Sequence, residues 1–396
     1  MKKLLFIFPL FLFAKDSILS NLQIEKLNLD KKYTIQDSKE TKKSWINPVM
    51  LQYSINQNNS LHTVKTTTQN FAITLNQPIF KSGAIYYSIK YANDNKNYSL
   101  KELELKKRAL IKEALNFVID YKINRLNEEI LRLDIDNAKI DVKRKKEQYQ
   151  NGTLDLSFLN NAIIYLNSLK LSMQDLKINA LNLNYAFKNL SDMNIQNVNT
   201  TLFKITSFNK YLQDNIELHS IEKRSKINRD LYKMQIGNTL FTISLNASYN
   251  IQKTSYSKNL PNFQDDTNNF YSVGIGVSLP IDFTAGEKRQ KAKINYLTSK
   301  LDILQKKREL KNNFANTLKQ IAYIQNKIKI YQNNIKLYNE LIATTKDSIK
   351  AGNATIDDLE TLQNTKKTNA INIKILKLQI QKLLLNLYYK TTLFSN

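Results

Sequence analysis

The sequence predicts an α+β membrane protein built from four β-strands and two long helical hairpins. Three observations lead to this fold class: an internal repeat of about 200 residues, four stretches of alternating apolar and polar residues, and two long stretches without Pro or Gly. A repeat on this scale indicates that one structural unit occurs twice. With only 7 Gly and 5 Pro in 396 residues, the composition favours long uninterrupted elements over a loop-rich enzyme.

The composition also excludes several kinds of site. The 59 Lys and Arg outnumber the 34 Asp and Glu, but charges of both signs are interleaved. This favours a generally Lys-rich composition over a dedicated nucleic-acid-binding patch. The absence of Cys excludes disulfides, zinc–thiolate sites and a Cys nucleophile, and 2 His and 5 Met leave little for other metal sites. We therefore expect no metal and no cofactor.

The first residues predict export from the cytoplasm. Lys2 and Lys3 precede an apolar run over 4–13, and Ala14 supplies a small residue at a cleavage site. This order is typical of a cleaved signal peptide, here 1–14, and about ten residues of helix span only about 15 Å, too short to cross a bilayer. Export disfavours nucleic acid as a partner.

Two pairs of matching landmarks define the repeat. Before each long helix, a Pro and then a Gly are predicted to turn the chain out of a strand: Pro78 and Gly83 in the first repeat, Pro280 and Gly286 in the second. After each long helix, a short segment with a central Gly forms the predicted hairpin tip. The residues of these tips are Asn151, Gly152 and Thr153 in the first repeat, and Ala351, Gly352 and Asn353 in the second.

These landmarks set the predicted boundaries. The first repeat, 15–208, should contain a helix, strands at about 47–57 and 66–79, a long helix 84–150, a tip 151–154, a return helix 156–190 and an intermediate region 191–208. The second repeat, 209–396, should contain a helix 209–235, strands at about 239–251 and 269–281, a long helix 287–350, a tip 351–355 and a return helix 357–390.

The predicted strands have the character of membrane strands. Each is apolar on one side, as in Leu51, Tyr53 and Ile55, and carries Ser, Thr, Asn, Gln or Gly on the other, with almost no charge. The outer face of a soluble sheet usually carries Lys and Glu instead. Lengths near ten residues and the signal peptide fit transmembrane β-strands better than a half-buried soluble sheet, which remains the alternative.

The remaining residues predict helices that pack as coiled coils. Each long helix covers roughly 100 Å at 1.5 Å per residue. Both return helices repeat apolar residues at spacings of three and four, for example Leu159, Ala162 and Leu166. This period predicts left-handed packing against neighbouring helices.

Four strands cannot close a barrel, because the smallest closed barrels need about eight. In lipid an open sheet edge would leave backbone groups without hydrogen-bond partners. The sheet must therefore be completed by other copies of the chain, and geometry allows two or three copies.

At its junctions and tips the chain resembles the TolC-like outer-membrane efflux proteins, along nearly the whole mature sequence. The resemblance rests on the duplicated order of strand, Pro, Gly and long helix, and on the duplicated tip followed by a heptad helix. It implies a homotrimer with a twelve-stranded barrel in outer-membrane lipid and a helical tunnel in the periplasm. It also implies that the tips dock a periplasmic adaptor, which links the duct to an inner-membrane pump of RND, ABC or MFS type.

We therefore expect a passive exit duct of a tripartite efflux pump or a type I secretion system, without catalytic activity. The main alternative is a periplasmic coiled-coil adaptor or structural protein without its own channel. Its relatives have one hairpin and charged outer strand faces, unlike this chain. An outer-membrane enzyme would need a catalytic cluster that the sequence does not show, and the export signal disfavours a DNA-binding coiled coil.

The resemblance also marks acidic residues beyond the tips. Family members often carry acids there that line a closed entrance, and the basic latch residue of the family is replaced here by Ala354. Phe158 and Thr361 stand where further acids are common. The candidate entrance residues are Asp358, Asp357, Glu360 and Asp155. Two roles remain open for the acids after the second tip, helix capping beside Thr355 and lining of the pore, and one residue can do both.

Overall fold

The computed structural model describes residues 18–395 except 62–63, 200–201 and 258–263, so the predicted signal peptide lies outside the described residues. The chain separates into two compact units, and each is assembled from both repeats. The unit that we call the strand unit contains Leu29–Glu102 and Leu218–Gln305. The other, the hairpin unit, contains the described residues up to Asn28, Leu103–Glu217 and the chain from Lys306 onward.

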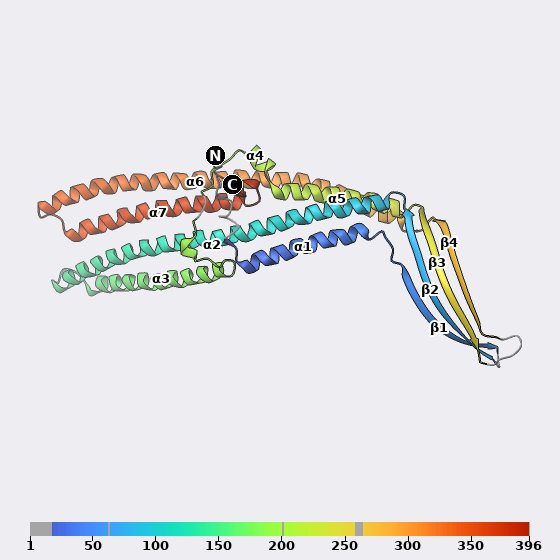
Figure 1. Ribbon diagram of the computed structural model, residues 1–396. Helices are drawn as coiled ribbons and strands as arrows, with labels where there is room; N and C mark the ends of the chain where they lie inside the picture. The colour runs from blue at the N-terminus through green and yellow to red at the C-terminus, as the bar shows by residue number, and fades with distance from the viewer. Residues whose placement is uncertain (1–17, 62–63, 200–201, 258–263, 396) are drawn as a thin grey trace, which may run out of the picture. The chain divides into compact units, whose positions relative to one another are not determined.

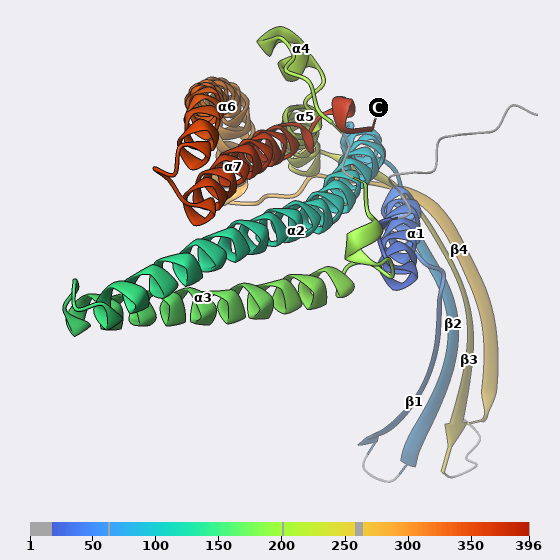
Figure 2. The ribbon, with the colours of Figure 1, turned by 90° about the vertical axis from the view of Figure 1, so that its left-hand side faces the viewer.

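The strand unit contains one antiparallel sheet of four strands in the order β1-β2-β3-β4. The strands are β1 (Met50–Leu61), β2 (Val64–Phe80), β3 (Thr242–Tyr256) and β4 (Asp266–Ser278). They lie side by side in chain order and bend together (Figure 2). Long helices and one four-stranded antiparallel sheet confirm the predicted α+β class.

The register of the sheet aligns the apolar residues of all four strands on one face. Leu51 pairs with Ile73, Ile73 with Tyr249, and Tyr249 with Tyr271. Among these, the side chains of Leu51 and Tyr271 are 67% and 80% exposed. Residues such as Thr74 alternate with them and occupy the other face. The chain thus presents a wide apolar sheet face that its own described residues leave uncovered.

All four strands run further toward their connecting loops than the alternation predicts. β1 continues to Leu61 and β2 begins at Val64, because Asn, Gln and Thr residues pair through their backbones even where the side chains are no longer apolar. At the end away from its loop, β4 stops at Ser278, earlier than predicted, before Pro280, which has no N–H to donate. Pro78 lies inside β2, where the register shifts between Pro78 and Phe80.

The two strand-to-helix junctions are built differently. At the first, Gly83 has φ +84° and Ser82 has φ +42°, so the turn needs the left-handed conformation that Gly adopts without strain. At the second, Gly286 lies inside the first turn of a helix rather than in the turn, which corrects the prediction for this residue. Asp282 makes that turn by accepting hydrogen bonds from the Thr284 backbone N–H (2.8 Å) and hydroxyl.

Gly237, in the strand unit, packs closely against the backbone of another segment. It is near the end of α5 (Ile216–Asn238), beside the turn that precedes α2 (Ala84–Gln150). A Cβ at this position would lie 2.7 Å from the Ala84 nitrogen and 2.8 Å from the Ser82 oxygen. These are backbone atoms, which cannot move aside cheaply, so the packing requires Gly.

The hairpin unit contains two helical hairpins. The first joins α2 to α3 (Leu156–Lys188), and the second joins α6 (Ala285–Lys350) to α7 (Ile356–Tyr388) (Figure 1). At 67 residues, α2 is about 100 Å long. None of the described helices is both long and apolar enough to cross a bilayer.

α7 also packs against α2, and this contact joins the two hairpins. Asn364 donates a hydrogen bond to Asn137 (2.9 Å), and Lys382 forms an ion pair with Asp120 (2.6 Å). Further along, Leu385 of α7 belongs to the main buried apolar cluster, which takes five residues from α2. Those five residues are Ile111, Ala114, Leu115, Val118 and Ile119.

The helix predicted at 209–235 is interrupted. α4 (Phe208–Gln213) has Asp214 as its C-cap, and α5 begins only at Ile216. At the break, Asn215 forms a β-bridge with Thr391, and the Ile216 N–H donates to the Lys390 oxygen (2.8 Å). Backbone groups that would hydrogen-bond within a continuous helix are therefore paired with the C-terminal segment instead. The remaining elements are α1 (Asn21–Lys43) and the short 3-10 helices η2 (Ile195–Asn197) and η3 (Thr392–Ser395).

Candidate functional site

The hairpin tips share one backbone design. Gly152 has φ +70° and Gly352 has φ +78°, the left-handed conformation that ends many helices. In the first tip the Thr153 N–H donates to the Gln148 oxygen (2.9 Å), and in the second the Asn353 N–H donates to the Ser348 oxygen (2.8 Å). The tips are therefore compact turns, and their residues are exposed.

The two return helices begin with different caps. Asp155 is the N-cap of α3. Hydrogen bonds from Ser157, first from its side chain and then from its backbone N–H (2.8 Å), lower the pKa of the Asp155 carboxyl. Thr355 caps α7 in a reciprocal capping box with Asp358. The Thr355 hydroxyl accepts from the Asp358 N–H (3.2 Å), and the Asp358 carboxylate accepts from the Thr355 N–H (3.0 Å).

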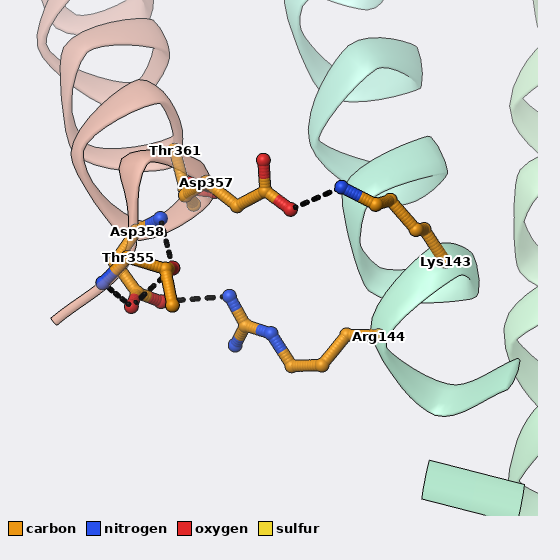
Figure 3. A network of polar contacts seen from close by, with 6 residues as sticks. All are labelled: Lys143, Arg144, Thr355, Asp357, Asp358 and Thr361. Carbon is orange, nitrogen blue, oxygen red and sulfur yellow. Dashed lines mark hydrogen bonds and ion pairs between the residues drawn. The ribbon is translucent and has the colours of Figure 1, made fainter. Parts of the chain in front are cut away.

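The acids after the second tip also reach across to α2. Asp358 forms an ion pair with Arg144 (2.7 Å), and Asp357 forms one with Lys143 (3.1 Å) (Figure 3). We call these four residues the tip lock. Figure 3 shows both basic side chains extending from α2 toward the first turn of α7. The lock therefore ties the end of one hairpin to the end of the other within one chain.

The charges of the tip lock stabilise each other's ionised forms. Hydrogen bonds from Thr355, first from its hydroxyl and then from its backbone, lower the pKa of Asp358, and the positive charge of Arg144 adds to this. The hydrogen bond to Asp357 raises the pKa of Lys143, with Glu147 contributing. Asp358 and Lys143 are consequently charged at neutral pH.

The structure brings together only part of the predicted entrance set. Asp357 and Asp358 lie side by side and share the tip lock, whereas Asp155 caps the other hairpin. Glu360 is exposed and makes no ion pair with a described residue. Capping, one of the two roles left open by the sequence, is therefore present at Asp358, and pore lining stays a prediction.

Sequence reasoning missed the basic half of the lock. The replacement of the family's latch residue by Ala354 left no expected partner for the acids, but Lys143 and Arg144 supply one from the opposite hairpin. A usable signal was present: Arg144 lies eight residues before Gly152 and Asp358 six residues after Gly352. Oppositely charged residues at similar distances from the two tips can meet if the hairpins lie side by side.

Sequence comparison identifies the family through the second repeat. Residues 208–389 match the family model described as "Outer membrane efflux protein". This match confirms the resemblance of the second repeat to outer-membrane efflux proteins. A search of curated proteins by sequence finds no match. The family's description supplies both a location, the outer membrane, and a process, efflux.

Comparison with solved structures shows the same fold along almost the whole chain. The outer membrane protein VceC of Vibrio cholerae has a TM-score of 0.74 at 11% identity, covering 93% of each chain. The outer membrane channel CmeC of Campylobacter jejuni has a TM-score of 0.73 at 15% identity, covering 95% of this chain and 84% of its own. The open state of the Neisseria gonorrhoeae MtrE channel scores 0.65 at 12% identity, covering 95% and 86%. This chain therefore has the fold of these outer-membrane proteins.

Proposed function

We propose that this protein is the outer-membrane exit duct of a tripartite efflux pump or a type I secretion system. It would conduct substrates passively from an inner-membrane transporter to the exterior and would catalyse no reaction of its own. In this role, the residues near the tips would provide hydrogen bonds and ion pairs and would have no catalytic function. Energy would come from the pump.

The observation that carries this proposal is the sheet. Its apolar face is exposed, and β1 and β4 are both edge strands, because the order is β1-β2-β3-β4. A sheet placed in lipid must pair its edges, since no water reaches their backbone groups. Each strand is antiparallel to its neighbour, so β1 and β4 run antiparallel to each other, and β4 of one copy can pair with β1 of the next. Three copies give the twelve strands that the family resemblance implies.

The hairpin unit would then form the periplasmic part of the duct. The tips at 151–153 and 351–353 would meet a periplasmic adaptor, and Asp357 and Asp358 would lie at the entrance. The alternative, a periplasmic adaptor, would expose this wide apolar sheet face to water. An N-terminal signal peptide over 1–14 would direct export before assembly.

Fractionation followed by unboiled electrophoresis tests the proposal. The protein should appear in the outer-membrane fraction as an oligomer that dissociates on heating. Deletion of the gene should then sensitise cells to detergents, bile salts, dyes or antibiotics if the duct serves efflux, or abolish release of a secreted protein if it serves secretion. A water-soluble monomer in the absence of detergent would refute the duct.

A further inference from the structure

A cavity of about 770 Å³ lies in the hairpin unit, beside the contact between α2 and α7. On α2 its lining residues fall between Asp120 and Asn137, and on α7 they fall between Asn364 and Lys382. These four residues make the contacts between the two helices that were described above. The volume lies in the range of small-molecule sites. We call this space the basic cavity, for the charges of its lining.

The segment 196–203 contributes to the lining and is held by both helices. The Lys122 ammonium of α2 donates a hydrogen bond to the Val198 carbonyl oxygen (2.9 Å). The Phe203 N–H donates to the side-chain oxygen of Gln381 on α7 (2.7 Å). The basic cavity is therefore bounded by two helices and by a segment that is anchored on each of them.

The basic cavity offers apolar surface to a ligand. Leu126, Leu202, Leu378 and the ring of Tyr121 contribute to its lining. The side chain of Leu202 is 76% exposed. A ligand that covered this side chain would remove apolar surface from water, which favours binding.

The same cavity carries an excess of positive charge. Its lining includes two acidic residues, Glu128 and Glu129, and five basic residues. The basic residues are Lys122, Arg125, Arg132, Lys374 and Lys377. Arg125 neutralises Glu128 in an ion pair of 2.6 Å. Arg132, Lys374 and Lys377 are exposed and make no ion pair with a described residue, so they can bind the negative charge of a ligand.

The general abundance of Lys does not account for this excess. The tips Gly152 and Gly352 set a shift of 200 residues between the repeats, so each lining residue of the two helices has a counterpart in the other repeat. Lys377 has the basic counterpart Lys177. The counterparts of the other four basic residues are the uncharged Ala322, Gln325, Gln332 and Gln174. The positive charge is therefore concentrated on the α2–α7 surface and is not a property of both repeats.

We propose that the basic cavity binds an anionic amphiphile, a small molecule with a carboxylate, sulfate or sulfonate head and an apolar body. The head lies among Arg132, Lys374 and Lys377, and the body lies against Leu202 and Leu378. The charge excess selects an anion over a cation or a neutral molecule. The apolar lining selects an amphiphile over a simple inorganic anion.

Such a ligand contacts both hairpins, because α2 belongs to the first and α7 to the second. Binding therefore stabilises the contact between the hairpins by mass action. A saturating ligand should slow backbone hydrogen exchange over 121–132 and 374–381. The inference goes beyond the proposed duct, because it concerns a site whose lining lies entirely in the hairpin unit.

Fluorescence titration of the full-length protein tests the site. The probe is the fluorescent fatty acid dansylaminoundecanoate, and the protein is held in nanodiscs of phosphatidylcholine, which has no net charge. The double variant Lys374→Gln with Lys377→Gln should bind the probe more weakly on the order of tenfold, because two of its charge partners are lost. The uncharged methyl ester of the probe should bind the wild type and this variant alike.

The matched control is Lys366→Gln with Lys367→Gln. It removes the same charge from the same helix, but neither residue belongs to the lining of the basic cavity. The control should leave the affinity for the probe close to that of the wild type. An unchanged circular dichroism melting curve for both double variants would show that they are folded.

Three results would overturn the inference. These are equal affinity of the wild type and of Lys374→Gln with Lys377→Gln, an equal loss of affinity in both double variants, and unchanged hydrogen exchange over 121–132 and 374–381 in the presence of the probe. None of these results bears on the oligomeric state or the location of the protein, so the proposed duct would stand.

Discussion

In the proposed trimeric duct, removing the guanidinium of the tip lock should open the entrance. In Arg144→Gln the ion pair to Asp358 is lost, while the capping box between Asp358 and Thr355 remains. The two side chains are 46% and 38% exposed, so the 2.7 Å pair contributes no more than a surface pair does, about 0.5 kcal/mol. In a trimer that opens as one unit, three such losses sum to about 1.5 kcal/mol, or about tenfold in the ratio of open to closed channels.

Single-channel recording in planar bilayers measures this ratio. The matched control is Lys146→Gln, which removes the same charge from an exposed residue of α2 that makes no ion pair with a described residue. High salt should raise the open fraction of the wild type toward that of Arg144→Gln, because salt screens exposed charges. Equal open fractions in the two variants would refute a role for the lock and leave only a general effect of charge.

Three further predictions concern the tip lock, the N-cap of α7 and the close packing at Gly237. At constant salt, the open fraction of channels should rise as the pH falls below about 4. Bonds from Thr355 lower the pKa of Asp358 in closed and open channels alike, but the further lowering by Arg144 belongs to the closed state, so the stabilisation that it gives is present above the ordinary value of 3.8 and is lost as the carboxyl protonates. The raised pKa of Lys143 preserves its pair until the pH exceeds about 10.5, so a transition between pH 6 and 8 in such recordings would contradict this assignment. Thr355→Ala should destabilise the first turn of α7 by about 1 kcal/mol and speed its hydrogen exchange, whereas unchanged exchange would show that the cap is dispensable. Gly237→Ala should destabilise the fold by on the order of 1–3 kcal/mol and lower the temperature at which the oligomer dissociates, because the new Cβ would lie 2.7 Å from a backbone atom. The control is Gly274→Ala, which should change this temperature far less, because nothing lies within 4 Å of its new Cβ.

Much of the fold was accessible from the sequence because its periodicities are long and uninterrupted. The alternation through Leu51 and Tyr53 predicted strands, and the register aligns those residues with the apolar residues of β2 on one face. The break at Asp214 and Asn215 was missed because it depends on a bridge to Thr391, 176 residues away in the chain, and local pattern carries no trace of such a partner.

Only the local part of the candidate site could be predicted from the sequence. Capping of α7 by Thr355 and Asp358 is a local interaction between neighbours in sequence, and the acidic first turn indicated it. The ion pairs to Lys143 and Arg144 span 214 residues each. Their existence depends on how the two hairpins pack, which no spacing within one helix records.

By itself, the sequence determined the duplicated plan, the strand faces and the hairpins, because each follows from a repeat or a periodicity that acts over neighbouring residues. Only the tertiary structure decided which of two equivalent helix faces is covered. In α7 the face at Ile371 is buried on α2, while the matching face at Leu171 of α3 is open. Both faces have the same heptad pattern. They differ because the two hairpins of one chain make a single contact with each other, and that contact covers only the face on α7.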